Sequence, residues 1–133
     1  MTTYAITRPN EVLIPIAGSD ALFPVRRIYC VGRNYAEHAR EMGADPSREP
    51  PFFFSKPRDA IVVGNGEVPV DIPFPPATDN LQHEVELVVA IGQGGLDIPE
   101  ADALAHVVGY ATGIDFTRRD LQTLAREKQH PWE

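Results

Sequence analysis

Two apolar stretches that carry carboxylates constrain the fold of this chain more than any other feature. The first, Gln82–Ile91, contains Glu84 and Glu86, and the second, Val107–Ile114, is followed directly by Asp115. Both stretches are rich in β-branched residues, which favours strands. Because alternate side chains of a strand share a face, the two glutamates point the same way, and that face continues in apolar residues.

The carboxylate face has two interpretations. Like charges roughly 7 Å apart on a half-buried face repel each other, and a bound cation relieves that repulsion most directly. A third carboxylate from Asp115 would complete an all-oxygen site for Mg²⁺, Mn²⁺ or Ca²⁺. In the other interpretation Glu84 and Glu86 are solvated residues of an edge strand, because an E-x-E pattern alone is a weak signal.

Composition and charge predict one globular domain and exclude some classes of partner. The 133 residues, 43% of them hydrophobic, are enough to bury a core. With 19 acidic against 12 basic residues the net charge is −7, so nucleic acid is not an expected partner. The single cysteine, Cys30, lies among apolar neighbours, which indicates a buried thiol in a reducing cytoplasm. Since no apolar run approaches the roughly 20 residues of a membrane span, we expect a cytoplasmic protein without a membrane segment.

The other elements are predicted from apolar runs and turn residues. Strands and hairpins are expected at Tyr4–Val25 (a hairpin or arm), Ile28–Val31, Phe52–Lys56, and Ile61–Val63 with Val68–Val70 (a hairpin). Helices are expected at Asn34–Gly43, at Pro99–His106, and from a cap at Thr117 onward.

Three of these elements carry further candidate residues. His38 and Glu41 lie at i, i+3 of the first helix, so the carboxylate can hold the imidazole as a general base requires; an ordinary surface pair is the alternative. Lys56 either faces an anionic ligand or merely ends its strand in solvent. Arg119 and Gln122 lie one turn apart on the last helix, close in sequence to the carboxylate strand.

Taken together, four motifs in order resemble the fumarylacetoacetate hydrolase family, and in detail its bacterial fumarylpyruvate (acylpyruvate) hydrolase branch. The motifs are Cys30–His38, Phe54–Pro57, His83–Leu87 and Asp115–Gln122. Each motif alone is weak, whereas four in the right order are specific. Gln82 stands where many relatives have a second histidine, which we interpret as a minor departure.

The resemblance implies a mixed α+β fold, a β-roll with peripheral helices, and a set of site residues. The implied metal ligands are Glu84, Glu86 and Asp115, holding Mg²⁺, or Mn²⁺, with Ca²⁺ possible in crystals. The implied catalytic residues are His38, Glu41 and Gln122, and the implied substrate-binding residues are Arg33, Lys56 and Arg119.

The implied activity is hydrolysis of a C–C bond in a 2,4-dioxo acid such as fumarylpyruvate, giving pyruvate and a carboxylic acid in aromatic catabolism. The alternatives are a decarboxylase or isomerase acting through the same metal enolate, or an inactive, truncated metal-binding remnant. Because family members run on well beyond Glu133, we expect residues 1–25 to form an arm and residues 26–133 the N-terminal portion of the catalytic domain, with the C-terminal part missing. A homodimer, or association with a C-terminal fragment, is expected to cover the exposed strand edges.

Overall fold

The computed structural model describes residues 3–7, 10–32, 34–35, 52–64 and 66–131. The chain divides into two compact units, one up to Ile72 and one from Pro73 to Trp132. Strands with a few helices confirm the α+β class, whereas the domain boundary expected after residue 25 stays a prediction. In the part of the chain that the structure describes, no helix has both the length and the apolar character needed to cross a membrane.

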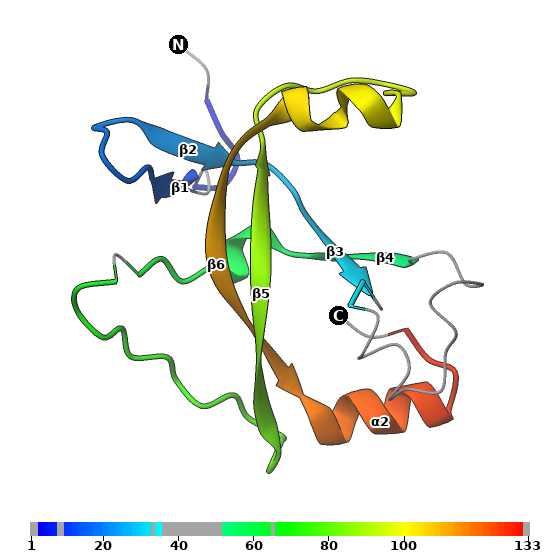
Figure 1. Cartoon of the computed structure of the whole chain (residues 1–133). Coiled ribbons are helices and arrows are strands. Elements are labelled where there is room, and N and C mark those ends of the chain that lie inside the picture. Colours follow the sequence, from blue (N-terminus) through cyan, green and yellow to red (C-terminus); the bar gives the residue numbers. More distant parts are fainter. Residues whose placement is uncertain (1–2, 8–9, 33, 36–51, 65, 132–133) are drawn as a thin grey trace. The chain divides into compact units, whose positions relative to one another are not determined.

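The first unit begins with a short antiparallel hairpin of β1 (Val12–Pro15) and β2 (Leu22–Val25), as the sequence predicts (Figure 1). The turn is closed by the Ser19 backbone N–H, which donates to the Ile16 carbonyl at 3.1 Å. Gly18 adopts a φ of 72° in this turn, a left-handed conformation that favours glycine. Val25 ends the hairpin and is 8% exposed, so it is the most sheltered apolar side chain described.

A second antiparallel pair consists of β3 (Ile28–Gly32) and β4 (Phe52–Lys56), which confirms both predicted strands. Ile28 lies opposite Lys56 at one end, and Gly32 lies opposite Phe52 at the other. A Cβ at position 32 would lie 2.2 Å from the Phe52 ring, so this ring packs on a backbone that only glycine allows. The short 3₁₀ helix η1 (Arg58–Ala60) follows β4 after Pro57.

The hairpin predicted between Ile61 and Val70 is wrong, because the described residues from Ile61 to Asn80 contain no strand. Pro69 stands in the middle of the predicted second strand and has no backbone N–H to donate to a ladder. Val62 and Val68 remain more than half exposed, so side-chain burial does not stabilise the pairing either.

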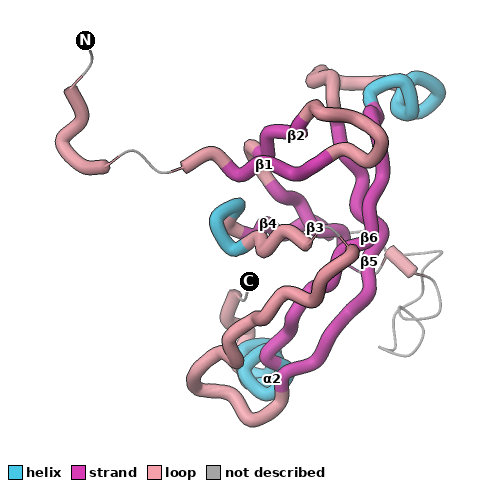
Figure 2. Tube along the Cα trace, turned by 90° about the vertical axis from the view of Figure 1, so that its left-hand side faces the viewer, coloured by secondary structure: helices cyan, strands magenta, loops and turns pink. Residues whose placement is uncertain are grey.

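The second unit is built on one long antiparallel ladder of β5 (Leu81–Ile91) and β6 (Val107–Arg118). The 3₁₀ helix η2 (Glu100–His106) connects the strands at one end, and the helix α2 (Arg119–Glu127) leaves the other end, as Figures 1 and 2 show. The predicted cap at Thr117 is wrong. Pairing with β5 continues to Arg118, so Thr117 belongs to the strand and the helix begins at Arg119.

The two faces of the β5–β6 ladder differ in chemistry and in exposure. One face carries the opposed pairs Glu84 with Asp115, Glu86 with Gly113, Val88 with Ala111, and Ala90 with Gly109. The other carries Val85 with Ile114, Leu87 with Thr112, and Val89 with Tyr110. Val85 and Leu87 are each 64% exposed, whereas Glu84, Glu86 and Asp115 are half-buried. In the described structure the carboxylates therefore lie on the more sheltered face.

Candidate functional site

Three carboxylates share one face of the β5–β6 ladder. Glu84 of β5 lies directly opposite Asp115 of β6, and Glu86 lies two residues further along the same face. Directly opposed residues of an antiparallel pair have Cβ atoms roughly 5 Å apart. All three side chains are half-buried, and the Oδ1 atom of Asp115 is itself shielded from solvent. The ladder thus places three negative charges close together where water screens them only partly.

Gly113 lets the Val88 side chain pack closely on the β6 backbone beside Glu86. It lies opposite Glu86 and two residues before Asp115, so a side chain at this position would stand between the two carboxylates. A Cβ there would also lie 2.7 Å from the Cγ2 atom of Val88, closer than real contacts allow. The place that a side chain at position 113 would take is therefore filled by Val88.

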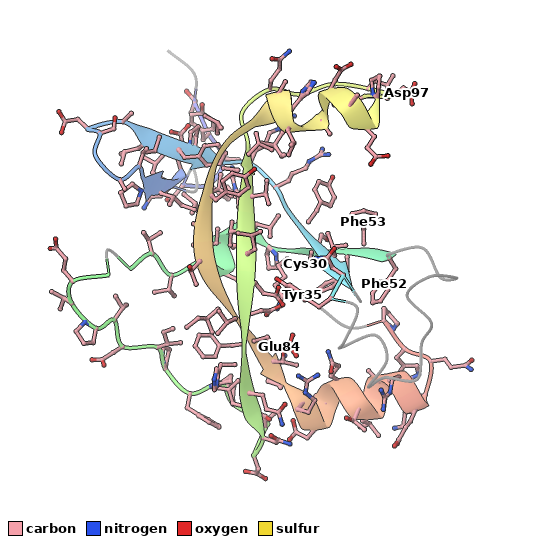
Figure 3. The ribbon with its side chains drawn as sticks, in the orientation of Figure 1. Cys30, Tyr35, Phe52, Phe53, Glu84 and Asp97 are labelled. Atoms are coloured by element: carbon pink, nitrogen blue, oxygen red, sulfur yellow. The ribbon has the colours of Figure 1, made fainter. Side chains whose placement is uncertain are left out.

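Arg119, the first residue of α2, brings a positive charge to this face. Its Nη2 atom forms an ion pair with Glu84 Oε1, and the two side chains are 27% and 32% exposed. Figure 3 shows Glu84 on β5 above the start of α2. The guanidinium also donates from Nε to Gln82 Oε1 at 2.8 Å and from Nη1 to Gln122 Oε1 at 2.5 Å. Two amide side chains thus hold the arginine in one orientation while it neutralises one of the three carboxylates.

A second group of hydrogen bonds ties the start of α2 to the loop before β5. Asp120 accepts from the Thr78 hydroxyl at 2.6 Å and from the Asp79 backbone N–H at 3.1 Å. The Arg119 backbone N–H donates to the Asn80 carbonyl at 2.9 Å. The hydrogen bond from Thr78 holds the pKa of Asp120 below its ordinary value; burial opposes this shift, and backbone N–H groups add to it. We call this group the Thr78–Asp120 clasp; it positions the backbone that carries Arg119.

The donor set fits a hard divalent cation, since all three candidate ligands are carboxylates and no soft donor shares their face. His83 has the opposite strand parity and lies opposite Phe116. The side chains are aligned rather than gathered: within the described ranges, no three His, Cys, Asp or Glu residues converge closely enough to hold a metal ion. The strand pair therefore places three ligands of the right type on one face, but their carboxylate oxygens do not surround a single point.

The other residues predicted for the site fall into two groups. His38, Glu41 and Arg33 lie outside the described residues, so the structure does not test the acid–base pair. Lys56 ends β4 in the first unit, and Gln122 lies on α2 within hydrogen-bonding distance of Arg119. Their predicted roles stay predictions.

Sequence reasoning missed Gln82 and the clasp. Gln82 has the same strand parity as Glu84, a signal that could have placed its amide beside the carboxylate face. Nothing in the local pattern connects Thr78 with Asp120, because the two residues are 42 positions apart and meet only through the fold.

The sequence of the chain is similar to those of several known proteins. A family model described as fumarylacetoacetate (FAA) hydrolase C-terminal matches residues 27–133. The mitochondrial oxaloacetate decarboxylase of Dictyostelium discoideum is 43% identical over 107 residues, which are 80% of this chain and 47% of that protein. The mitochondrial oxaloacetate tautomerase of Arabidopsis thaliana is 43% identical over 106 residues, which are 80% of this chain and 45% of that protein.

Among solved structures, a fumarylpyruvate hydrolase from Pseudomonas aeruginosa in complex with Mn²⁺ and pyruvate is 56% identical, with a TM-score of 0.91. The match covers 98% of this chain and 56% of that chain. This likeness confirms the fold type expected from the sequence. The chain spans about half the length of the relatives it matches.

Proposed function

Because the chain belongs to the fumarylacetoacetate hydrolase family, whose members are enzymes, we propose that it takes part in the metal-dependent hydrolysis of an acylpyruvate such as fumarylpyruvate. The products are pyruvate and a carboxylic acid. The resemblance to the Pseudomonas fumarylpyruvate hydrolase, 56% identical over almost the whole chain, supports this substrate class.

The observation that carries the proposal is the opposition of Glu84 and Asp115 on a half-buried face that also holds Glu86. We propose that these three carboxylates hold one Mg²⁺ or Mn²⁺ ion, consistent with the Mn²⁺ bound in the Pseudomonas structure. Such a cation acts as a Lewis acid toward the oxygens of a 2,4-dioxo acid.

The protein groups have separate proposed tasks. Arg119, held by Gln82 and Gln122, keeps a fixed positive charge beside the carboxylate face and can receive negative charge that develops on the substrate. His38, oriented by Glu41, takes a proton from water, and the oxygen of that water attacks the carbonyl far from the substrate carboxylate. The C–C bond between this carbonyl and the methylene group breaks, and the methylene carbon takes up a proton to become the methyl group of pyruvate.

A second candidate function follows from the names of two relatives, an oxaloacetate decarboxylase and an oxaloacetate tautomerase. Both reactions act on a 2-oxo acid and need no water attack on a carbonyl. In this case Arg119 would again place a positive charge beside the substrate, whereas His38 would not activate water.

A product assay separates the candidates. The purified chain is incubated with Mn²⁺ and either fumarylpyruvate or oxaloacetate. Organic acids are identified by liquid chromatography, carbon dioxide by its release, and keto–enol exchange by ultraviolet absorbance. Pyruvate and fumarate formed from fumarylpyruvate, and lost in Glu86→Gln, support the hydrolase. Carbon dioxide release or keto–enol exchange from oxaloacetate alone supports the second candidate. Binding of Mn²⁺ without turnover of either substrate would support the inactive metal-binding remnant instead.

We also propose that the working form contains a partner, either a second copy of the chain or a C-terminal fragment. The exposed apolar face around Val85 and Leu87 supports this proposal, because soluble proteins rarely leave such a face uncovered. A cytoplasmic role in aromatic catabolism completes the proposed assignment.

A further inference from the structure

Basic residues gather at one end of the β3–β4 ladder. Ile28 pairs with Lys56 as the last rung, so Arg27 and Arg26 precede β3 at the same end where Pro57 and Arg58 follow β4. Four of the 12 basic residues of the chain thus meet within a few positions of one rung. The arrangement follows from antiparallel pairing alone, because the start of one strand lies beside the end of the other.

These residues surround a hollow of about 390 Å³. Its polar lining comes from Arg26, Arg27, Tyr29, Ser55, Lys56 and Arg58, and its apolar lining from Ile28 and Pro57. The lining residues therefore include four basic residues and no acidic residue. The Arg27 Nη1 atom donates to the Tyr29 hydroxyl at 3.2 Å, which holds one guanidinium against the strand. The volume lies at the lower end of the range typical of small-molecule sites.

The cluster is electrostatically unfavourable without a counter-ion. Positive charges held within a few residues of one rung repel each other. The chain has a net charge of −7, so it has enough carboxylates to neutralise these four basic residues. Yet among the described residues neither Arg26, Arg27 nor Arg58 forms an ion pair, and Asp59, beside Arg58 in sequence, does not line the hollow.

We propose that this hollow binds a small doubly charged oxyanion, either a dicarboxylate or inorganic phosphate. Guanidinium groups bind both through paired N–H donors. The proposal does not depend on the carboxylates of the β5–β6 ladder, because every residue that lines the hollow belongs to the first compact unit. Lys56, a candidate substrate-binding residue, would then contact an anion together with three arginines.

The test is a calorimetric titration of the purified chain with fumarate and with phosphate. Metal is first removed with a chelating resin, so that no metal-dependent binding contributes, and the ionic strength is held constant with chloride. The double variant Arg26→Gln/Arg58→Gln removes two charges from the hollow. The matched control Arg118→Gln/Arg126→Gln removes two charges from the second unit, at exposed positions.

One of the two dianions should bind to the wild type and to the control with similar affinity. The double variant should bind it at least about tenfold more weakly, as expected when charge-assisted hydrogen bonds are removed. Tighter binding of fumarate would identify a dicarboxylate site, and tighter binding of phosphate a phosphate site. The proposal is overturned if neither dianion binds, or if both double variants lose affinity equally, since the second result would reflect overall charge alone. A circular dichroism spectrum of each variant checks that its fold is intact.

Discussion

Glu84 and Asp115 occupy directly opposed positions of the β5–β6 ladder, and Arg119 forms an ion pair with Glu84. Together with Glu86, the face carries three negative charges against this one positive charge. A divalent cation would neutralise the two charges that remain, so the charge count itself favours such an ion. The consequences for stability and metal binding can be measured.

Glu86→Gln should weaken metal binding and the stabilisation that it provides. At a metal concentration one hundred times the dissociation constant, a ligand that binds only the folded state adds about 2.7 kcal/mol. We expect Mg²⁺ or Mn²⁺ to raise the Tm of the wild type, and to raise that of Glu86→Gln clearly less. Glu127→Gln, at the end of α2, is the control. If metal does not raise the Tm of the folded wild type, or raises the Tm of the variant equally, Glu84 and Glu86 are solvated residues and not ligands.

Arg119→Gln should destabilise the metal-free protein and increase the benefit of metal. Without the guanidinium, Glu84 and Asp115 repel each other across the ladder. The loss should be about 1 kcal/mol, or roughly 4 °C in Tm, because the pair is partly exposed. Added Mg²⁺ should recover more of the Tm in the variant than in the wild type. Arg118→Gln removes the same charge from the exposed neighbouring position, and an equal response there would contradict a specific role for Arg119.

Thr78→Val should loosen the clasp at the start of α2. Thr78 is 8% exposed, and its hydroxyl donates to Asp120 and accepts from the Asn80 backbone N–H. Loss of these hydrogen bonds should lower the Tm by roughly 4 °C, whereas Thr78→Ser, which keeps the hydroxyl, should lose much less. Because the clasp positions Arg119 on Glu84, the same variant should also increase the rise in Tm that Mg²⁺ produces, as Arg119→Gln does; an unchanged rise would leave the clasp a purely structural feature.

The clasp also predicts a pH dependence. The pKa of Asp120 is lower in the folded state than in the unfolded state, so the stabilisation from its ionised form is complete above the ordinary aspartate value of about 3.9. It is lost as the pH falls through the lowered pKa, because the unfolded chain takes up the proton first. Thr78→Val, which removes the main cause of the shift, should reduce the loss of Tm between about pH 5 and pH 2. A Tm profile parallel to that of the wild type would contradict this.

The apolar face of the β5–β6 ladder should mediate association. Val85 and Leu87 are exposed on it, and Tyr110 is 62% exposed on the neighbouring strand. We expect light scattering to report a mass above the 14.7 kDa of one chain, and Leu87→Glu to lower it. Leu104→Glu, on the exposed surface of η2, should not. A monodisperse wild-type monomer with cooperative unfolding would contradict the predicted partner contact.

Local patterns determined most of the strands and the shared face of Glu84 and Glu86. Strand alternation has a period of two residues and depends only on neighbours, so β3, β4, β5 and β6 could be predicted from sequence. The hairpin expected at Ile61–Val70 failed because Pro69 interrupts the ladder, and the helix start expected at Thr117 failed because strand pairing extended past Asp115. Both errors arise where a local signal competes with pairing.

Only the tertiary structure decided which residues meet. Register sets Glu84 opposite Asp115, and a shift by one residue would have turned one of the two carboxylates to the other face. The ion pair of Arg119 with Glu84 and the hydrogen bond of Thr78 to Asp120 join residues 35 and 42 positions apart. No local propensity encodes such pairs, because their energy depends on distances that exist only once the strands have paired and α2 has formed at the end of β6.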